Sequence, residues 1–246
     1  MHDSLGNRIK TFYEAIPRIS LTRRLPMIIR IDGRAFHSLL RKAVKPFDQD
    51  FIEAMWTTAA AVCQEISGCM MAYAQSDEVS FLVRDDQTFD TQPWFGKDIQ
   101  KMASVSASIA SAHLTQIMGK IVTFDSRSFV LPKEEVTNYM IWRQQDASRN
   151  SISMACYAEL GKKMGRKTSQ KLMHGKNVDE QQELLFQECG INWNDYPTYL
   201  KRGVCIIKQS YEVNGAMRKR WGVDKDIPIF TQDREYIEKF LKDSND

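Results

Sequence analysis

The order of strand and helix signals in the first 130 residues most constrains the fold of this chain. A β-branched, apolar run at 25–31 stops at Asp32 and Gly33, which predicts a strand followed by a break. Asp48 can cap a helix that runs to about Ile66, because apolar residues then recur at helical spacing. The other predictions are helices at 35–42 and 98–118 and strands at 69–74, 79–83 and 121–130. This order predicts an α+β chain with a ferredoxin-like (βαββαβ) arrangement, in which helices cover one face of an antiparallel sheet.

The pattern becomes mainly helical after Pro132. Helices are predicted at 134–160, 179–188 and 233–241, a strand at 203–211, and a short amphipathic helix at 7–16 near the start of the chain. No Gly- or Ser-rich linker separates the two halves. We therefore expect a first region at 1–131 and a mainly helical region at 132–246, packed on each other as one unit.

Composition places the chain among soluble globular proteins and points to an anionic partner. Charged residues make up 26% and hydrophobic residues 43% of the 246 residues, and no apolar run approaches the roughly 20 residues of a membrane span. The chain begins without a signal-peptide core, so we expect a cytoplasmic protein. The net charge is only +3, yet residues 161–176 contain six basic residues and no acid. Such a local positive field suits a polyanion, although a solvated helix surface would give the same pattern.

Three acids lie where the predicted topology brings chain segments together. Asp32 follows the first strand, and Asp77 and Glu78 lie in the hairpin that joins the second and third strands. The first and third strands are central neighbours in this topology, so Asp32 and Asp77 are expected at one edge of the sheet. Two close carboxylates repel each other unless a cation lies between them. Mg²⁺ is the natural candidate, because it takes oxygen ligands and brings substrate phosphates with it.

The neighbours of Asp32 agree with a phosphate-containing substrate. Gly33 permits close backbone approach, and a helix beginning near Ala35 would offer free N–H groups to a phosphate chain. Arg34 and Lys45 could neutralise its charge. The alternative is that Asp32 only caps a helix and that Asp77 and Glu78 form an ordinary turn. The absence of GxxxxGK[ST], GxGxxG and HExxH motifs argues against P-loop, dinucleotide-binding and zinc-dependent enzymes.

Two segments carry a specific resemblance. The heptad IDGRAFH ending at His37, with Lys45, Pro46 and Asp48, and the segment YAQSDEVSF ending at Phe81 resemble the tRNA-His guanylyltransferase superfamily. Its members add nucleotides to the 5′ end of tRNA in the 3′-to-5′ direction. The similarity spans roughly residues 10 to 211 and continues in Trp94 and Phe95, in Lys101 to Ala103, in Trp142, Arg143, Gln144 and Asp146, in 183–186, in 190–194 and in 201–203.

The resemblance implies a polymerase-type palm domain in the first region and a defined set of site residues. It implies two Mg²⁺ ions held by Asp32, the Gly33 carbonyl and Asp77, with Glu78 as a further acid of the same site. It also implies ATP and GTP, or other nucleoside triphosphates, as substrates, tRNA as partner, and a homotetramer. The positions that match nucleotide-binding residues of the family are Arg34, Ala35, Phe36, His37, Lys45, Ser76 and Lys101.

Departures from the eukaryotic guanylyltransferases indicate a particular branch. Where those enzymes carry a HINNLY-type segment, this chain reads Ser148 to Ser153, and Gln181 and Gln182 replace a Lys-Asn pair. The chain is more similar to the guanylyltransferase-like proteins of bacteria and archaea. That similarity implies template-dependent repair of 5′-truncated tRNA, and it leaves guanylate addition to tRNA-His open. The basic residues Lys162, Lys163, Arg166 and Lys167 are expected to contact the tRNA backbone.

Two other functions stay possible on the sequence. A nucleotidyl cyclase needs similar metal-binding acids on a palm domain, although the similarity beyond residue 132 disfavours it. A non-catalytic RNA-binding module on a ferredoxin-like sheet would place stacking aromatics on the central strands. The predicted strands here carry Ile29, Ile31 and Tyr73 instead. The loop with Trp193, Tyr196 and Tyr199 could stack on bases or simply pack inside the fold.

Overall fold

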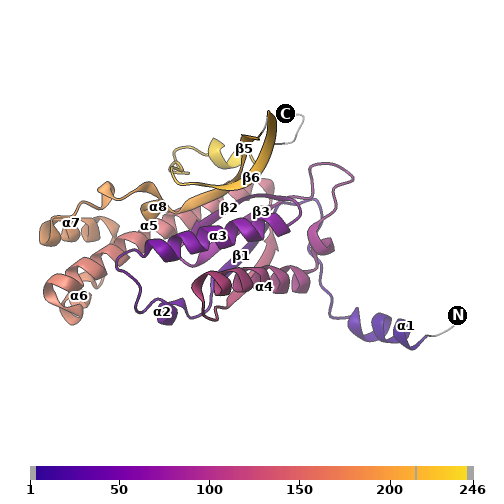
Figure 1. The fold of residues 1–246 in the computed structure, drawn as a ribbon, viewed down its shortest axis with the longest axis horizontal. Coiled ribbons are helices and arrows are strands. Elements are labelled where there is room, and N and C mark those ends of the chain that lie inside the picture. Colours follow the sequence, from indigo (N-terminus) through magenta and orange to yellow (C-terminus); the bar gives the residue numbers. More distant parts are fainter. Residues whose placement is uncertain (1–3, 214, 243–246) are drawn as a thin grey trace.

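A six-stranded antiparallel sheet forms the centre of the molecule (Figure 1). The computed structural model describes residues 4–213 and 215–242. The strand order is β4-β1-β3-β2-β5-β6, in which the first four strands have the order of a ferredoxin-like sheet, as predicted. The strands are β1 (Met27–Gly33), β2 (Cys69–Gln75), β3 (Glu78–Val83), β4 (Phe124–Val130), β5 (Val204–Val213) and β6 (Ala216–Asp224).

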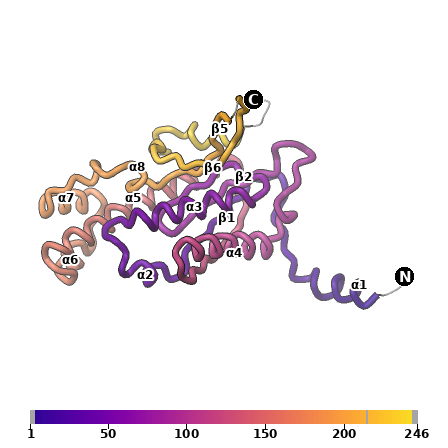
Figure 2. Tube along the Cα trace, in the orientation of Figure 1, coloured from indigo at the N-terminus to yellow at the C-terminus, as the bar shows by residue number. Residues whose placement is uncertain are grey.

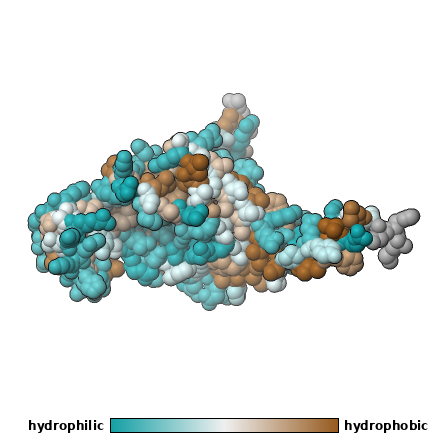
Figure 3. All heavy atoms as spheres, turned by 90° about the horizontal axis from the view of Figure 1, so that it is seen from below, coloured by the Kyte–Doolittle hydropathy of each residue, from teal (hydrophilic) through white to brown (hydrophobic). Residues whose placement is uncertain are grey.

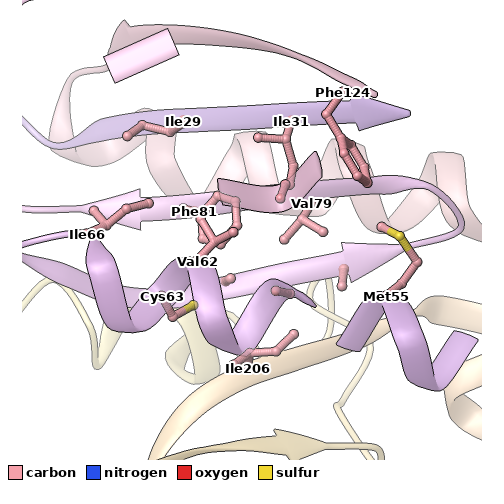
Figure 4. Close-up of a cluster of buried hydrophobic side chains, with 14 of the residues drawn as sticks. Ile29, Ile31, Met55, Val62, Cys63, Ile66, Val79, Phe81, Phe124 and Ile206 are labelled. Carbon is pink, nitrogen blue, oxygen red and sulfur yellow. The ribbon is translucent and has the colours of Figure 1, made fainter. Parts of the chain in front are cut away.

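Helices α3 (Gln49–Glu65) and α4 (Ile99–Met118) cover one face of the sheet. The Asp48 side chain accepts a hydrogen bond from the Phe51 N–H at 3.0 Å and so caps α3. Apolar side chains at helical spacing then face the sheet, where Met55 and Val62 lie over Ile31 and Phe81 of the two central strands (Figure 4). This core holds the strands in the register that defines the site.

A second layer covers the opposite face, so the helices are not confined to one side. Helix α5 (Lys133–Met164) has 32 residues and is about 48 Å long. Its first half packs Val136 and Met140 on Ile28 and Leu82 of the sheet. Its second half extends past the sheet edge and packs against α6 (Arg166–Met173) and α7 (Val178–Cys189), with the buried side chains Ile152, Leu160, Leu185 and Trp193 between them.

The region after residue 132 also contributes strands. Strand β5 was predicted and pairs with β2, but β6 was not predicted, because its first half is basic and exposed. The β5–β2 pairing ends at Ile207, whereas the β5–β6 pairing continues to Val213, so the hairpin projects from the sheet as a two-stranded ribbon. Two predicted helices are shorter than expected, namely α2 (Phe36–Leu39) and α9 (Glu235–Glu238); η2 (Trp94–Lys97), η3 (Trp193–Asp195) and α8 (Thr198–Arg202) complete the fold.

The N-terminal segment extends away from the body of the molecule (Figure 2). It consists of α1 (Leu5–Ile9) and the π-helical turn η1 (Lys10–Glu14), where a helix was predicted at 7–16. Its apolar side chains are exposed, including Phe12 at 61% and Ile16 at 75%. Figure 3 shows apolar surface along this projecting arm. None of the helices described is both long and apolar enough to cross a lipid bilayer.

Candidate active site

The structure brings Asp32 and Asp77 together at one edge of the sheet. Asp32 lies opposite Glu78 in the β1–β3 register. The Gly33 N–H donates a hydrogen bond to the Asp77 carbonyl at 3.0 Å, which joins the end of β1 to the β2–β3 turn. Ser76 completes this turn with a positive φ of 49°. The juxtaposition expected from topology alone is therefore present.

The two carboxylates carry negative charge that the protein does not fully compensate. Burial raises the pKa of Asp32 and the neighbouring charge of Asp125 raises it further, while the charges of Arg30, Arg127 and Arg143 oppose this rise without cancelling it. Burial also raises the pKa of Asp77, although the Ser76 hydroxyl donates to its Oδ1 at 3.1 Å and opposes this shift. Within residues 4–213 and 215–242, no side chain donates a hydrogen bond to the Asp32 carboxylate. A cation bound at this edge would supply the missing charge.

The available ligands fit a hard divalent cation. No cluster of three or more His, Cys, Asp or Glu side chains suited to a metal occurs in the described part of the chain. A site at this edge would therefore use two carboxylates together with backbone carbonyls, water and substrate phosphates. This mixture suits Mg²⁺, which keeps several waters, and it does not suit a structural zinc ion.

Glu78 forms an ion pair with Arg143 of α5 through its carboxylate. Its carboxylate receives two hydrogen bonds from the Arg143 guanidinium, at 2.7 and 2.8 Å, and the residue is only 8% exposed. Arg143 also donates to Asp146 at 2.9 Å. Glu78 therefore anchors α5 to the sheet edge and does not present a free carboxylate beside Asp32. The sequence could not show this, because Arg143 lies 65 residues away along the chain.

The segment after β1 provides backbone donors and little helix dipole. Instead of the predicted helix at 35–42, α2 is a single turn, and Ala35 before it has a φ of 59°. The Arg34 N–H donates a hydrogen bond to the Thr123 carbonyl at 2.9 Å. The N–H groups of Ala35, Phe36 and His37 have no acceptor within the described residues. Consecutive free N–H groups next to a left-handed residue form a cradle for anions.

The side chains of this segment divide by burial. Arg34 and His37 are exposed and can reach a ligand. The Phe36 ring is buried, and it packs against Phe51 and Phe124 with ring centroids 5.9 and 5.2 Å apart. A Cβ at Gly33 would lie 2.6 Å from that ring, so glycine is required for Phe36 to pack there. Phe36 thus contributes its backbone to the site, while its side chain belongs to the core.

A mostly apolar pocket opens beside the Ser76 turn, between α3 and α5. Lys45 and Ser76 line it together with Met55 and Trp56 of α3, and α5 contributes Ala147, Asn150, Ser151 and Met154. Apolar walls with a few polar groups are typical of a site for a nucleobase. Tyr199 of the aromatic loop also lines the pocket, whereas Trp193 is buried and Tyr196 packs edge-on against Phe47. We call this cavity the α3–α5 pocket.

Lys101 does not join the other expected nucleotide-binding residues. It lies in the first turn of α4, next to Asp98, which bridges to Ser20 before β1 begins. Helix α4 is about 30 Å long and ends near β4, whose Phe124 pairs with Gly33. Lys101 is therefore at the opposite end of the sheet from Asp32. The helix at α4 was predicted correctly from its periodicity, but the direction in which α4 runs places Lys101 far from Asp32.

The four basic residues expected to contact tRNA lie at the end of α5 and the start of α6. Lys162 and Lys163 form ion pairs with Glu159 and Glu188, at 2.8 and 3.0 Å. Arg166 and Lys167 are exposed. Lys162 also donates to the Lys45 carbonyl at 3.4 Å, which places this basic surface next to the α3–α5 pocket.

Two groups of cationic residues were not predicted, one beside Asp32 and one on the ribbon, which projects from the opposite end of the sheet. Arg30 precedes Asp32 by two residues on the same strand, and its buried Nε has no hydrogen-bond partner in the part of the chain that the structure describes. Residues two apart in a strand lie on the same face, so the position of Arg30 two residues before Asp32 could have indicated that Arg30 lies at the site. The ribbon carries Arg218, Lys219 and Arg220, all exposed, with Arg220 over the Tyr211 ring at 5.1 Å. The sequence signal that could have indicated the ribbon is a run of basic residues close to aromatic residues near the ends of the strands.

Comparisons with known proteins agree with this geometry. A family model described as tRNAHis guanylyltransferase matches residues 6–132, and the model of the C-terminal domain of that family matches residues 134–239. The probable tRNA(His) guanylyltransferase of Dictyostelium discoideum is 29% identical over 227 residues, which cover 85% of this chain and 84% of the relative.

Two solved structures share a higher identity with this chain. A bacterial tRNA(His) guanylyltransferase-like protein in complex with ATP is 45% identical, with a TM-score of 0.84, covering 97% of this chain and 99% of the other. Its complex with GTP gives the same identity and coverage and a TM-score of 0.79. The resemblance identified in the sequence is thus confirmed, and the chain belongs to the tRNA-His guanylyltransferase family.

Proposed function

We propose that this protein adds nucleotides to the 5′ end of tRNA in the 3′-to-5′ direction, directed by the facing template base. The observation that carries the proposal is the pairing of Asp32 and Asp77 at one sheet edge, beside free backbone N–H groups and the α3–α5 pocket. Family membership supports the reaction class. The higher identity to the bacterial guanylyltransferase-like protein than to the Dictyostelium enzyme supports the repair branch.

The reaction joins a nucleotide by its 3′-hydroxyl. That oxygen attacks the α-phosphorus of an activated 5′ end, a new P–O bond forms, and pyrophosphate or AMP leaves with the electrons of the broken bond. A 5′-monophosphate is first activated with ATP, whereas a 5′-triphosphate needs no activation. The N–H groups of Ala35, Phe36 and His37 bind phosphate oxygens, and Arg34 and Lys45 balance their charge. The α3–α5 pocket holds a nucleotide base.

We assign the metal site to Asp32, the Gly33 carbonyl and Asp77, with Mg²⁺ as the metal. Two bound ions would lower the pKa of the attacking hydroxyl and neutralise charge on the leaving oxygen. The uncompensated carboxylates support this assignment. Glu78 keeps Arg143 and α5 in place next to the site.

Nucleotides and tRNA are the proposed ligands. ATP and GTP are bound by the bacterial relative, and the α3–α5 pocket has the chemistry for their bases. For the tRNA backbone we propose Lys162, Lys163, Arg166 and Lys167, and in addition the basic ribbon of β5 and β6. Both surfaces lie outside the metal site and can bind phosphates away from the reacting end.

A series of 5′-truncated tRNAs tests the function. Each RNA is incubated with Mg²⁺ and one nucleoside triphosphate at a time, and the added base is identified. We expect the added base to follow the facing template base throughout. Addition that ignores the template, or a cyclic product from ATP or GTP without RNA, would reject the proposal; the cyclic product would favour a nucleotidyl cyclase.

We also propose that the protein forms a homotetramer and acts in the cytoplasm. The exposed apolar side chains of α1 and η1 support self-association, because an isolated helical arm does not bury them.

A further inference from the structure

An exposed tryptophan lies beside the carboxylate edge and has no part in the site described above. Trp142 is on α5 and is 47% exposed. It precedes Arg143, whose guanidinium binds Glu78, and Glu78 lies opposite Asp32. The indole is therefore linked to the carboxylate edge through Arg143, which contacts both the ring and Glu78.

The indole is held rigidly. The Arg143 guanidinium lies over the Trp142 ring, 4.4 Å from its centroid, and is fixed by Glu78 and Asp146. The buried Tyr139 contacts the ring edge-to-face at 5.8 Å, and its hydroxyl forms a 2.8 Å hydrogen bond with Ser80. An apolar ring that is both fixed and half-exposed is preorganised for a flat ligand.

The surroundings indicate which ligand. Arg30 and Arg127 lie opposite each other on β1 and β4, and Arg143 reaches the same edge from α5. Arg127 and Arg143 also form ion pairs, with Asp125 and with Glu78 and Asp146. Arg30 retains a buried N–H without an acceptor among the described residues. An aromatic surface next to cations binds nucleic acid by base stacking and phosphate contact. The α3–α5 pocket begins only at Ala147, further along α5, so it does not include Trp142.

We propose that Trp142 stacks on the terminal base pair of the RNA duplex whose 5′ end reacts at Asp32 and Asp77. This inference rests on the proposed function. Arg143 covers one face of the indole, and the residue is still 47% exposed, which suits stacking on the wide face of a base pair, whereas the lined α3–α5 pocket suits one base. Stacking would align the last base pair, so that the next template base faces the incoming nucleotide.

The test uses a hairpin RNA with 2-aminopurine as its 5′-terminal, paired nucleotide, without nucleoside triphosphate or divalent cation. Stacking on indole quenches 2-aminopurine, so we expect the wild-type protein to lower the fluorescence at saturation. Trp142→Ala should abolish the quenching and raise the KM for the hairpin roughly 5- to 150-fold with kcat nearly unchanged. Trp142→Phe should retain part of the quenching and show a smaller rise of the KM for the hairpin than Trp142→Ala. Tyr157→Ala is the matched control, because Tyr157 is on the same helix and equally exposed, at 47%.

Three results would overturn the inference. The first is equal quenching by wild type and Trp142→Ala. The second is quenching of free 2-aminopurine riboside triphosphate that depends on Trp142, which would assign the ring to the incoming nucleotide. The third is a change of molecular mass in Trp142→Ala but not in Tyr157→Ala, which would make Trp142 a contact between copies. Because no catalysis occurs in the fluorescence assay, its failure is distinguishable from a failure of nucleotide addition.

Discussion

The chemistry of single residues at the sheet edge depends on charge that the fold leaves uncompensated. Folding raises the pKa of Asp32 above its ordinary value of 3.8, mainly through burial. The folded state thus binds a proton at Asp32 more tightly than the unfolded chain does. The free energy of unfolding therefore falls as the pH rises from the ordinary pKa of 3.8 through the raised pKa of the folded state. At neutral pH the ionised Asp32 carboxylate destabilises the metal-free protein.

We therefore expect Asp32→Asn to raise the melting temperature of the metal-free protein at pH 7. The gain should disappear at about pH 2, well below the ordinary value of 3.8, where Asp32 is protonated in both states. Mg²⁺ should reverse the order, because it stabilises only the protein that binds it. Calorimetry at both pH values, with and without Mg²⁺, measures this. A variant that melts at or below the wild-type temperature at pH 7 without metal would show that Asp32 is already compensated.

The ion pair between Glu78 and Arg143 gives a second prediction for single residues. Arg143→Met would leave a carboxylate that is 8% exposed without its cation, at a cost of about 3–5 kcal/mol in the free energy of unfolding. Adding Glu78→Gln should recover part of the loss. Arg149→Met is the control, since Arg149 makes an exposed pair with Asp146 worth less than about 1 kcal/mol. Equal losses in urea denaturation for the two arginine variants would contradict the buried anchor.

Among the secondary-structure elements, the ribbon of β5 and β6 is the least expected. It projects beyond its pairing with β2, and its outer half carries Arg218, Lys219 and Arg220 next to Tyr211. An exposed strand with adjacent cations has no alternating apolar pattern, so periodicity could not predict it. Such a ribbon can reach the RNA backbone at a distance from the reacting end.

Replacing Arg218, Lys219 and Arg220 together by Ser should weaken tRNA binding and its dependence on salt. Each lost phosphate contact should lower the slope of log affinity against log salt by about 0.7–0.9. The double change Arg166→Ser and Lys167→Ser is the comparison at the α6 surface. Filter binding between 50 and 200 mM salt, roughly the range in which such contacts show, gives both slopes. An unchanged slope in the triple variant would exclude the ribbon from RNA contact.

For the whole molecule, the sequence predicts what depends on local periodicity and misses what depends on distant contacts. The ferredoxin-like order and the meeting of Asp32 with Asp77 followed from apolar spacing, the Asp48 cap and topology. The Arg143 partner of Glu78 depends on how α5 runs across the sheet, and no residue pattern within that helix specifies its direction. The remote place of Lys101 follows from the ferredoxin-like order itself, because α4 begins after β3 at the end of the sheet away from Asp32.

The exposed N-terminal arm gives a prediction for the assembly. Phe12→Ser, Tyr13→Ser and Ile16→Ser together should lower the molecular mass from that of the proposed tetramer. The melting temperature of this triple variant should change little, because the three side chains are exposed and no residue of α1 or η1 is buried. Light scattering measures the mass, and a triple variant that remains tetrameric would show that the arm does not hold the copies together.

The central claim is that Asp32 and Asp77 act together at the sheet edge, and single-turnover nucleotide addition tests it most directly. The substrate is a 5′-triphosphorylated, truncated tRNA, which needs no activation step, with Mg²⁺ and the templated nucleotide. We predict that Asp32→Ala and Asp77→Ala each lose at least about a thousandfold in rate and that the double variant loses little more. Asp179→Ala, which removes an acid at the start of α7, should keep the wild-type rate. Addition by either single variant within about tenfold of wild type, in folded protein, would contradict the account.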